Sequence, residues 1–286
     1  MKSTKQRHPR WLKVPLPAGK NYFDIRTLIR QQNLHTVCES AHCPNIGECW
    51  NSRTATFMIL GDICTRNCRF CAVKTGNPYK VDCNEPNRVT EAVKTLGLKY
   101  AVITSVTRDD VPDGGASVFA DTIREIHQQV TACKVEVLIP DFQGDSSALN
   151  VVIDAQPEVL NHNLETVPRL YHQVRPQANY DRSIQLLDRA KQANMVTKTG
   201  LMLGLGETDL EILQVMKDLR TVNCDILTLG QYLQPSSEHI PIARYVSPHK
   251  FDTLKQQGLK MGFMHIESGP LVRSSYHAAS QPLRSD

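Results

Sequence analysis

Short apolar, β-branched runs alternate with amphipathic stretches along the chain from Thr54 onward. Continuous apolar runs of this length are typical of parallel strands that are buried on both faces. The pattern predicts strands at 54–60, 100–106, 134–140, 159–163, 197–203 and 226–232. It predicts helices at 89–97, 115–130, 146–155, 180–193, 208–221 and 248–258, followed by a short last strand at 262–268. Repeated βα units of this kind indicate a parallel α/β fold with right-handed crossovers.

Six βα units are fewer than the eight of a closed barrel. We therefore predict a partial, open (β/α)6 TIM-type barrel over residues 54–260, with an open doubly wound sheet as the alternative. Residues 1–53 form an N-terminal arm and a cysteine-bearing segment in this interpretation, and residues 261–286 form a C-terminal segment that closes the site. Prolines and Gly19 predict an extended arm over residues 1–20. A short helix is expected at 21–35, followed by a loop-like stretch that carries cysteines.

Composition narrows the class of protein. With 41% hydrophobic and 22% charged residues the chain of 286 residues is typical of a globular protein. The net charge of +4 is too small to indicate a nucleic-acid partner. The chain contains no run of 18 apolar residues, so we expect no membrane span. The basic start, Met1–Arg10, lacks an apolar h-region, so we expect a cytoplasmic protein in a reducing compartment.

Six of the nine cysteines lie between Cys38 and Cys71. Clustered thiols in a reducing compartment usually bind metal. Cys64, Cys68 and Cys71 are spaced Cys-x3-Cys-x2-Cys directly after the first predicted strand, and parallel folds place ligand sites at the carboxyl ends of strands. Three thiolates hold three irons of a [4Fe-4S] cube. The fourth iron is then open to a substrate or cofactor.

A second triplet, Cys38, Cys43 and Cys49, has the wider spacing Cys-x4-Cys-x5-Cys. The alternative is a zinc knuckle that uses Cys68 and Cys71, with His42 as a further ligand. Zinc sites usually present two closely spaced pairs of ligands, whereas this chain presents two triplets. The pattern therefore favours iron–sulfur clusters.

Phe70 stands before the last cysteine of the first triplet, and this motif resembles that of the radical S-adenosylmethionine (SAM) enzymes. The second triplet, within Thr36–Trp50, and the stretch Arg273-Ser-Ser-Tyr-His-Ala278 resemble the lipoyl synthase family. The resemblance runs from about Trp11 to Ala278. Further matching stretches are Thr104–Asp110, Ile139–Phe142, Asn161–Val167, Met202–Thr208 and Gly230–Pro235.

The resemblance implies two [4Fe-4S] clusters. The cluster on Cys64, Cys68 and Cys71 would bind SAM. The auxiliary cluster would use Cys38, Cys43, Cys49 and a serine as ligands and would donate sulfur. We carry this serine over to Ser275, with Ser274 as the alternative.

The implied reaction inserts two sulfur atoms at C6 and C8 of an octanoyl group on a lysine of a lipoyl carrier domain, with two SAM molecules per turnover. The implied partners are an octanoylated 2-oxoacid dehydrogenase E2 subunit or glycine-cleavage H protein, a low-potential donor such as flavodoxin or ferredoxin, and an iron–sulfur carrier. Alternative functions are another sulfur-inserting radical enzyme, a ferredoxin-like electron carrier and a zinc-stabilised binding module.

Six residues are candidates for contacts with SAM. Asn163 and Glu165 end the fourth predicted strand in a motif similar to that of biotin synthase, and a carboxylate there suits ribose hydroxyls. Gly204 and Gly206, with Glu207, follow the fifth strand and would let the backbone approach adenine. Helix caps and plain βα turns are the alternative interpretations of these positions. The last candidate is Phe70.

Overall fold

The strands form one sheet in which their spatial order follows the chain. The structure, a computed structural model, describes residues 8–282 and has an eight-stranded sheet ordered β1-β2-β5-β6-β7-β8-β9-β10. β1 is antiparallel to β2, and every other neighbouring pair is parallel. The strands are β1 (His35–Thr36), β2 (Thr56–Ile59), β5 (Tyr100–Ser105), β6 (Lys134–Leu138), β7 (Val159–Asn161), β8 (Val196–Leu203), β9 (Ile226–Gln231) and β10 (His265–Gly269).

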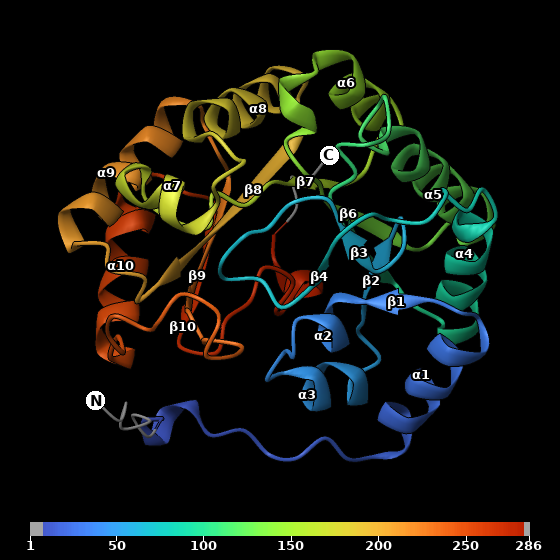
Figure 1. Cartoon of the computed structure of the whole chain (residues 1–286), viewed down its shortest axis with the longest axis horizontal. Helices are drawn as coiled ribbons and strands as arrows, with labels where there is room; N and C mark the ends of the chain where they lie inside the picture. The colour runs from blue at the N-terminus through green and yellow to red at the C-terminus, as the bar shows by residue number, and fades with distance from the viewer. Residues whose placement is uncertain (1–7, 283–286) are drawn as a thin grey trace.

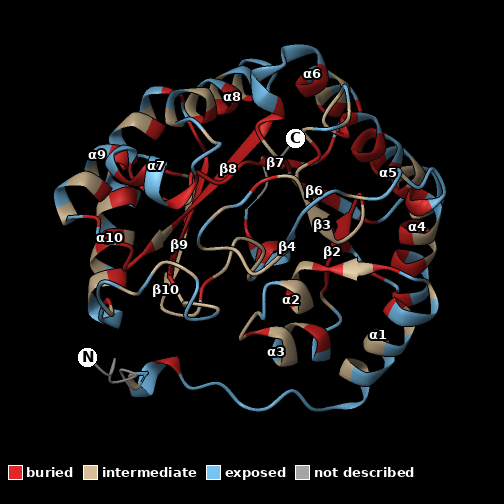
Figure 2. Ribbon diagram, in the orientation of Figure 1, coloured by how far each residue is buried: buried red, intermediate tan, exposed pale blue. Residues whose placement is uncertain are grey.

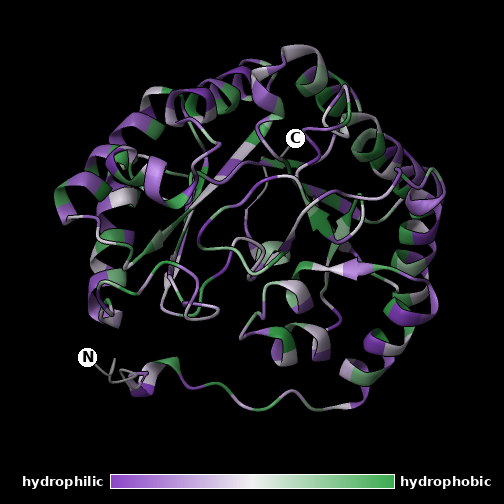
Figure 3. Ribbon diagram, in the orientation of Figure 1, coloured by the Kyte–Doolittle hydropathy of each residue, from purple (hydrophilic) through white to green (hydrophobic). Residues whose placement is uncertain are grey.

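Amphipathic helices cover the outside of this sheet (Figure 1). Their buried sides face the strands and their exposed sides are mostly hydrophilic (Figures 2 and 3). The longer helices are α1 (Lys20–Gln31), α4 (Glu85–Leu96), α5 (Ala116–Gln129), α6 (Ser146–Asp154), α8 (Tyr180–Gln192), α9 (Asp209–Thr221) and α10 (Pro248–Lys260). None of the helices in residues 8–282 is long and apolar enough to cross a membrane.

The partial-barrel prediction is confirmed. A doubly wound sheet reverses its strand order at a switch point. Here the order runs from β2 to β10 without a reversal, so the sheet curls in one direction around a lumen (Figure 1). β1 and β10 are the two ends of the sheet and the barrel stays open between them. The expected last strand exists as β10, which pairs with β9 in parallel.

Local capping explains where the helices begin and end. Thr208 starts α9 with a capping box, because its side chain accepts from the Glu211 N–H while the Glu211 carboxylate accepts from the Thr208 N–H. Asn179 caps α8 in a similar way by accepting from the Arg182 N–H. α4 ends at Gly97, whose φ of 61° lies in the left-handed region that glycine adopts without strain.

The cysteine-bearing N-terminal segment is more regular than predicted. The loop expected there contains two short helices, α2 (Val37–Ser40) and α3 (Ile46–Asn51). Thr36 starts α2 by accepting from the Glu39 N–H at 3.3 Å, a local signal that a helix-period pattern cannot register in four residues. The extended arm predicted for residues 1–20 lies partly outside the described residues, and Arg10–Leu12 forms a single 3-10 turn.

The C-terminal segment runs through the barrel lumen (Figure 1). Ala278 packs against Tyr100 and Val102 of β5. Closer to the mouth, the carbonyl oxygen of Val272 lies so near Gly230 of β9 that any Cβ there would clash with it. A glycine at this position therefore lets the segment lie against the strand.

His162, directly after β7, gives a pH-dependent stability. Its ring is buried between the Ile139 carbonyl, 2.9 Å from Nδ1, and the Ser183 hydroxyl, 3.0 Å from Nε2. Burial, and then the nearby positive charge of Arg175, lower the pKa of His162 to about 4. In the unfolded chain the pKa is about 6.5, so between these values only the unfolded chain takes up the proton. We expect the free energy of unfolding to decrease by about 3 kcal/mol as the pH falls from about 6.5 to 4.

Urea unfolding at pH 7, 6 and 5 checks this expectation. The variant His162→Gln should lose most of the decrease, whereas His172→Gln, at an exposed position of α7 (Tyr171–Val174), should keep it. An identical pH slope for His162→Gln and the native chain would contradict the assignment.

Candidate functional site

The loop Cys64–Cys71 starts at the carboxyl end of β2, where the sequence placed it. Cys64 lies in β3 (Ile63–Cys64), which pairs with β4 (Lys74–Thr75). The backbone N–H groups of Arg66 and Thr107 point at the Cys64 sulfur, with N···S distances of 3.4 and 3.3 Å. Thr107 follows β5, so the first cysteine is held between the ends of two neighbouring strands.

Arg66, inside this loop, anchors it to the barrel. Its guanidinium donates to both oxygens of Asp109 at 2.7 and 2.9 Å and to Asp141 at 2.6 Å. Arg182 adds a second contact to Asp141 at 3.2 Å. Burial opposes the charge on Asp141, but its hydrogen bond with Arg66 outweighs this and lowers its pKa to about 2. The two charges therefore stay ionised and fix the loop over β5 and β6.

The far half of the loop is attached to the opposite side of the barrel. The Arg69 N–H donates to the Val174 carbonyl at 2.9 Å, and Arg69 in turn accepts from the Ile240 N–H at 3.1 Å. The His239 ring lies 2.9 Å from the Cys71 carbonyl. Phe70 packs against the apolar core of the β8–β10 side. The loop therefore crosses the mouth of the barrel (Figure 1).

Burial and neighbouring cysteines disfavour the thiolate form of Cys68 and Cys71 in this loop. Burial raises the pKa of Cys71 to about 12, and the neighbouring Cys68 and Cys64 add to the rise. Burial also raises the pKa of Cys68, while the charge of Arg175 opposes this. Metal binding releases such protons, because only the thiolate is a ligand. A buried set of mutually repelling thiolates suits a group of high positive charge such as an iron–sulfur cluster.

The second triplet shows the same chemistry beside β2. Burial raises the pKa of Cys49 to about 12, with Cys38 and Cys43 contributing, and burial raises that of Cys38 to about 11. The backbone N–H group of Thr56 partly opposes this rise by its hydrogen bond to the Cys38 thiol. The Thr56 hydroxyl in turn donates to the Ser275 hydroxyl at 2.8 Å. The structure thus brings Ser275, 219 positions away from Thr56, to the same place as the cysteines.

Neither triplet is arranged around one ion. Within residues 8–282, no group of three or more His, Cys, Asp or Glu side chains surrounds a position for a single metal ion. Each triplet instead brings together three partly or fully buried thiols whose thiolate charges would act on one another. That donor set fits a cluster with three thiolate-bound irons.

Asn163 and Glu165 meet at the end of β7, as predicted. The Asn163 amide donates to Glu165 Oε1 at 3.1 Å, and burial raises the pKa of Glu165. The negative charge of Glu165 acts on Cys68 and Cys71, so this carboxyl group lies beside the first triplet. Its backbone has a φ of 67°, a strained value for a residue other than glycine. The site residues of the cysteine loop and of β7 therefore share one region of the lumen.

Gly204, Gly206 and Glu207 form a tight turn after β8. The Glu207 carboxylate accepts from the N–H groups of Gly204 and Leu205 at 2.7 and 2.9 Å. A Cβ at Gly204 would clash with Gln231 and with the carbonyl of Arg244. Glu207 is thus used to hold its own turn, and the glycine is required by packing. These contacts match the alternative that we considered for these residues, a βα turn.

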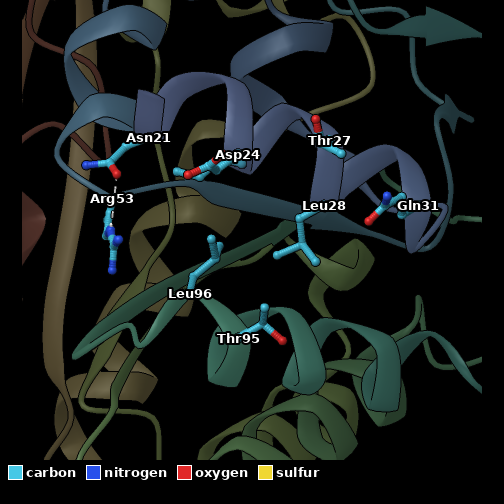
Figure 4. Close-up of a pocket in the computed structure, with 9 residues that line it drawn as sticks. Asn21, Asp24, Thr27, Leu28, Gln31, Arg53, Thr95 and Leu96 are labelled. Carbon is cyan, nitrogen blue, oxygen red and sulfur yellow. Dashed lines mark hydrogen bonds between the residues drawn. The ribbon is translucent and has the colours of Figure 1, made fainter. Parts of the chain in front are cut away.

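A cavity of about 360 Å³ lies apart from both triplets (Figure 4). It is a groove between α1 and the end of α4, lined by polar side chains such as Asn21, Asp24 and Arg53 and by Leu28 and Leu96. No cysteine lines it. The candidate chemistry therefore belongs to the barrel mouth rather than to this groove.

Several functional candidates escaped the sequence analysis. Arg66 and Asp141 hold the cysteine loop, and Arg175 lies fully inside the barrel wall near Cys68. Glu136 and Lys198 form an ion pair with no exposed side-chain surface. One signal was available for this pair, because a charged residue interrupts each of the apolar runs 134–140 and 197–203.

Comparison with known proteins decides the family. A sequence model of the radical SAM superfamily matches residues 58–219, and one of the N-terminal domain of lipoyl synthase matches residues 1–43. The chain is 60% identical over 275 residues to lipoyl synthase of Rubrobacter xylanophilus, covering 96% of this chain and 86% of that protein. It belongs to the lipoyl synthase family of the radical SAM superfamily. Lipoyl synthase of Koribacter versatilis is also 60% identical, with 96% and 90% of the two chains covered.

Membership of the lipoyl synthase family makes this chain a sulfur-inserting enzyme of lipoate biosynthesis that uses a [4Fe-4S] cluster and SAM. Solved structures agree on the fold. The hydrogenase maturase HydG is 15% identical and superposes with a TM-score of 0.56, covering 93% of this chain and 72% of that one. Family membership therefore excludes two of the alternative functions, a ferredoxin-like electron carrier and a zinc-stabilised binding module.

Proposed function

We propose that this lipoyl synthase family member inserts two sulfur atoms, at C6 and C8, into an octanoyl group that is amide-linked to a lysine of a lipoyl carrier domain. The sulfur comes from an auxiliary [4Fe-4S] cluster on Cys38, Cys43, Cys49 and Ser275. The observation that carries the proposal is the meeting of Ser275 with the second triplet, through the 2.8 Å contact to Thr56 beside Cys38. A ferredoxin-type site would need no such contribution from the other end of the chain.

The geometry favours Ser275 over Ser274 as the fourth ligand. The Ser274 hydroxyl is already engaged, since it accepts from Asn161 Nδ2 at 2.8 Å and donates to Asn163 Oδ1 at 3.0 Å. The Ser275 oxygen only accepts from Thr56, and its own proton can be lost on binding iron. A serine oxygen is a harder ligand than thiolate for this iron, which suits a cluster that gives up sulfur.

The first triplet, Cys64, Cys68 and Cys71, would hold the cluster that binds SAM. When bound, the cluster and SAM together would supply radical chemistry that removes a hydrogen atom from an unactivated C–H bond. No acid or base on the protein can deprotonate such a bond. Two hydrogen atoms leave the octanoyl group, so two SAM molecules are consumed in each turnover. Asn163, Glu165 and Phe70 are the proposed SAM contacts at the lumen, with Gly204, Gly206 and Glu207 as the proposed turn near adenine.

The role of the protein is to hold these groups and to exclude water. Arg66 fixes the cysteine loop through its buried ion pairs with Asp109 and Asp141. The C-terminal segment covers part of β5, where Ala278 packs against Tyr100 and Val102, and so limits solvent from that side. The proposed partners are an octanoylated E2 subunit or H protein, a flavodoxin or ferredoxin as electron donor, and an iron–sulfur carrier that rebuilds the auxiliary cluster.

One experiment tests the whole proposal. The anaerobically reconstituted protein is incubated with dithionite, SAM and an octanoyl-lysyl peptide, and mass spectrometry follows the peptide and the nucleoside together. We expect the peptide to gain two sulfur atoms as a dithiol under dithionite, and to lose two hydrogen atoms when that dithiol is afterwards oxidised to the disulfide. Two 5′-deoxyadenosine molecules should form for each product. Formation of 5′-deoxyadenosine without any change in the peptide would overturn the proposed substrate and favour another sulfur acceptor.

A further inference from the structure

A buried ion pair in the barrel lumen carries a chain of hydrogen bonds toward the C-terminal segment. Lys198 of β8 lies 2.9 and 3.1 Å from the two oxygens of Glu136 on β6, and neither side chain has any exposed surface. Tyr100 donates to the same carboxylate at 2.8 Å, and Asn161 Nδ2 donates to it at 3.1 Å. A buried carboxylate is costly unless it is paired with a positive charge and hydrogen-bonded. Lys198, Tyr100 and Asn161 meet that need, and each is consequently held in one orientation.

Asn161 connects the Glu136 carboxylate to Ser274 of the C-terminal segment. Its Nδ2 group has two N–H donors, of which one serves Glu136 and the other serves the Ser274 hydroxyl at 2.8 Å. The Asn161 Oδ1 atom is buried and has no hydrogen-bond partner among the described residues. Turning the amide over would relieve that atom but would place it against the Glu136 carboxylate. The orientation that serves Ser274 is therefore retained although an acceptor stays unsatisfied, which is rare in proteins.

Ser274 joins the C-terminal segment to the hydrogen-bonded series Lys198, Glu136 and Asn161. Its hydroxyl accepts from Asn161, the last residue of β7, and donates to Asn163, two residues further on, so the carboxyl end of β7 holds it. The segment is also attached at its flanks, where Asn45 donates to the Leu271 carbonyl at 2.7 Å and Tyr276 donates to Glu48 at 3.1 Å. Both flanking contacts reach the segment that bears Cys43 and Cys49. Ser274 thus attaches the centre of the segment to the β7 side of the barrel, while Ser275 meets Thr56 on the β2 side.

We infer that Asn161 and Ser274 are positioning residues that set the Ser275 hydroxyl beside the auxiliary triplet, with the Glu136–Lys198 pair as their anchor. This inference rests on the proposed function, because it takes Ser275 as a cluster ligand. Ser274 and Ser275 are neighbours in sequence and point to different partners, Asn161 in one case and Thr56 in the other. The two serines therefore have separate roles, one to hold the segment and one to bind iron.

The test isolates the auxiliary cluster in a full-length chain in which Cys64, Cys68 and Cys71 are alanine. In this parent we compare Ser274→Ala, Ser274→Thr, Asn161→Ala and the double variant, by Mössbauer spectroscopy and by the rate at which a chelator removes iron. The matched control is Ser268→Ala on β10, which likewise removes a hydroxyl; that hydroxyl makes one contact, to the Phe251 carbonyl at 2.8 Å. Thermal unfolding confirms that each variant is folded.

We expect Ser274→Ala and Asn161→Ala to bind the cluster with a heterogeneous signal from the serine-bound iron. Both should lose iron about five- to tenfold faster than the parent, the effect of roughly one hydrogen bond. Ser274→Thr keeps the hydroxyl and should restore the parent spectrum. The double variant should be no worse than either single variant, because both remove the same contact.

Three results would overturn the inference. The first is a Ser274→Ala spectrum and iron-loss rate equal to those of Ser268→Ala. The second is a double variant whose effects multiply. The third is retention of the native spectrum in Ser275→Ala together with complete loss in Ser274→Ala, which would make Ser274 the ligand. A parent chain that binds no second cluster would instead remove the proposed function, and the inference with it.

Discussion

Replacing Cys64, Cys68 and Cys71 together with alanine should abolish SAM cleavage and leave about half of the iron in the protein. The reason is that, in the proposed function, each triplet holds its own cluster of about four irons. The charge of Glu165, a proposed SAM contact, acts on Cys68 and Cys71 of the first triplet. The second triplet interacts with Thr56 and the C-terminal segment and loses none of those contacts. Iron and sulfide analysis, together with chromatography of 5′-deoxyadenosine after addition of dithionite and SAM, measures both effects.

Two controls sharpen the expected result. The variant in which Cys38, Cys43 and Cys49 are alanine should still form 5′-deoxyadenosine but should transfer no sulfur to the octanoyl peptide. Cys224→Ala should leave iron content and activity unchanged, because this buried thiol contacts the backbone carbonyls of Thr197 and Ile226. SAM cleavage that survived loss of the first triplet would refute the assignment of the two sites.

The barrel could be predicted because its strands have a simple pattern. Runs such as 100–106 and 226–232 became β5 and β9 almost residue for residue, since strands buried on both faces are continuously apolar and bounded by turns. The first triplet could be placed as well, because a motif that follows a parallel strand lies at the mouth of the sheet. Its cysteines do lie there, with Cys64 held by the N–H group of Thr107 after β5.

The remaining site depends on contacts that join distant parts of the chain. Nothing in the sequence pattern states that Ser275 meets Thr56, or that Asn161 donates to Ser274 across 113 positions. Glu136 and Lys198 were visible as charges within apolar runs, but their pairing depends on which faces of β6 and β8 point into the lumen. The short helix α2 of the cysteine segment begins at the cap Thr36, which is too local for a periodic pattern to show.

Replacing Lys198 with methionine should remove a large part of the stability of the barrel. The Glu136 carboxylate would then be buried without a positive partner, and breaking one side of a buried pair costs about 3–5 kcal/mol. A domain of this kind has about 5–15 kcal/mol in total. Tyr100 and Asn161 would still donate to the carboxylate, but two neutral donors do not balance its charge. Urea unfolding at pH 7 measures the loss, and Lys74→Met is the matched control.

Lys74 makes an exposed pair with Asp62 at 3.3 Å and its side chain is 77% exposed, so its replacement should change the free energy of unfolding by less than about 1 kcal/mol. The double variant Lys198→Met with Glu136→Gln removes both charges and keeps an acceptor for Asn161, and it should recover most of the lost stability. Equal stability of Lys198→Met and Lys74→Met would show that the lumen pair does not hold the barrel. Recovery in the double variant would show that the cost arises from an unpaired charge rather than from a lost lysine stem.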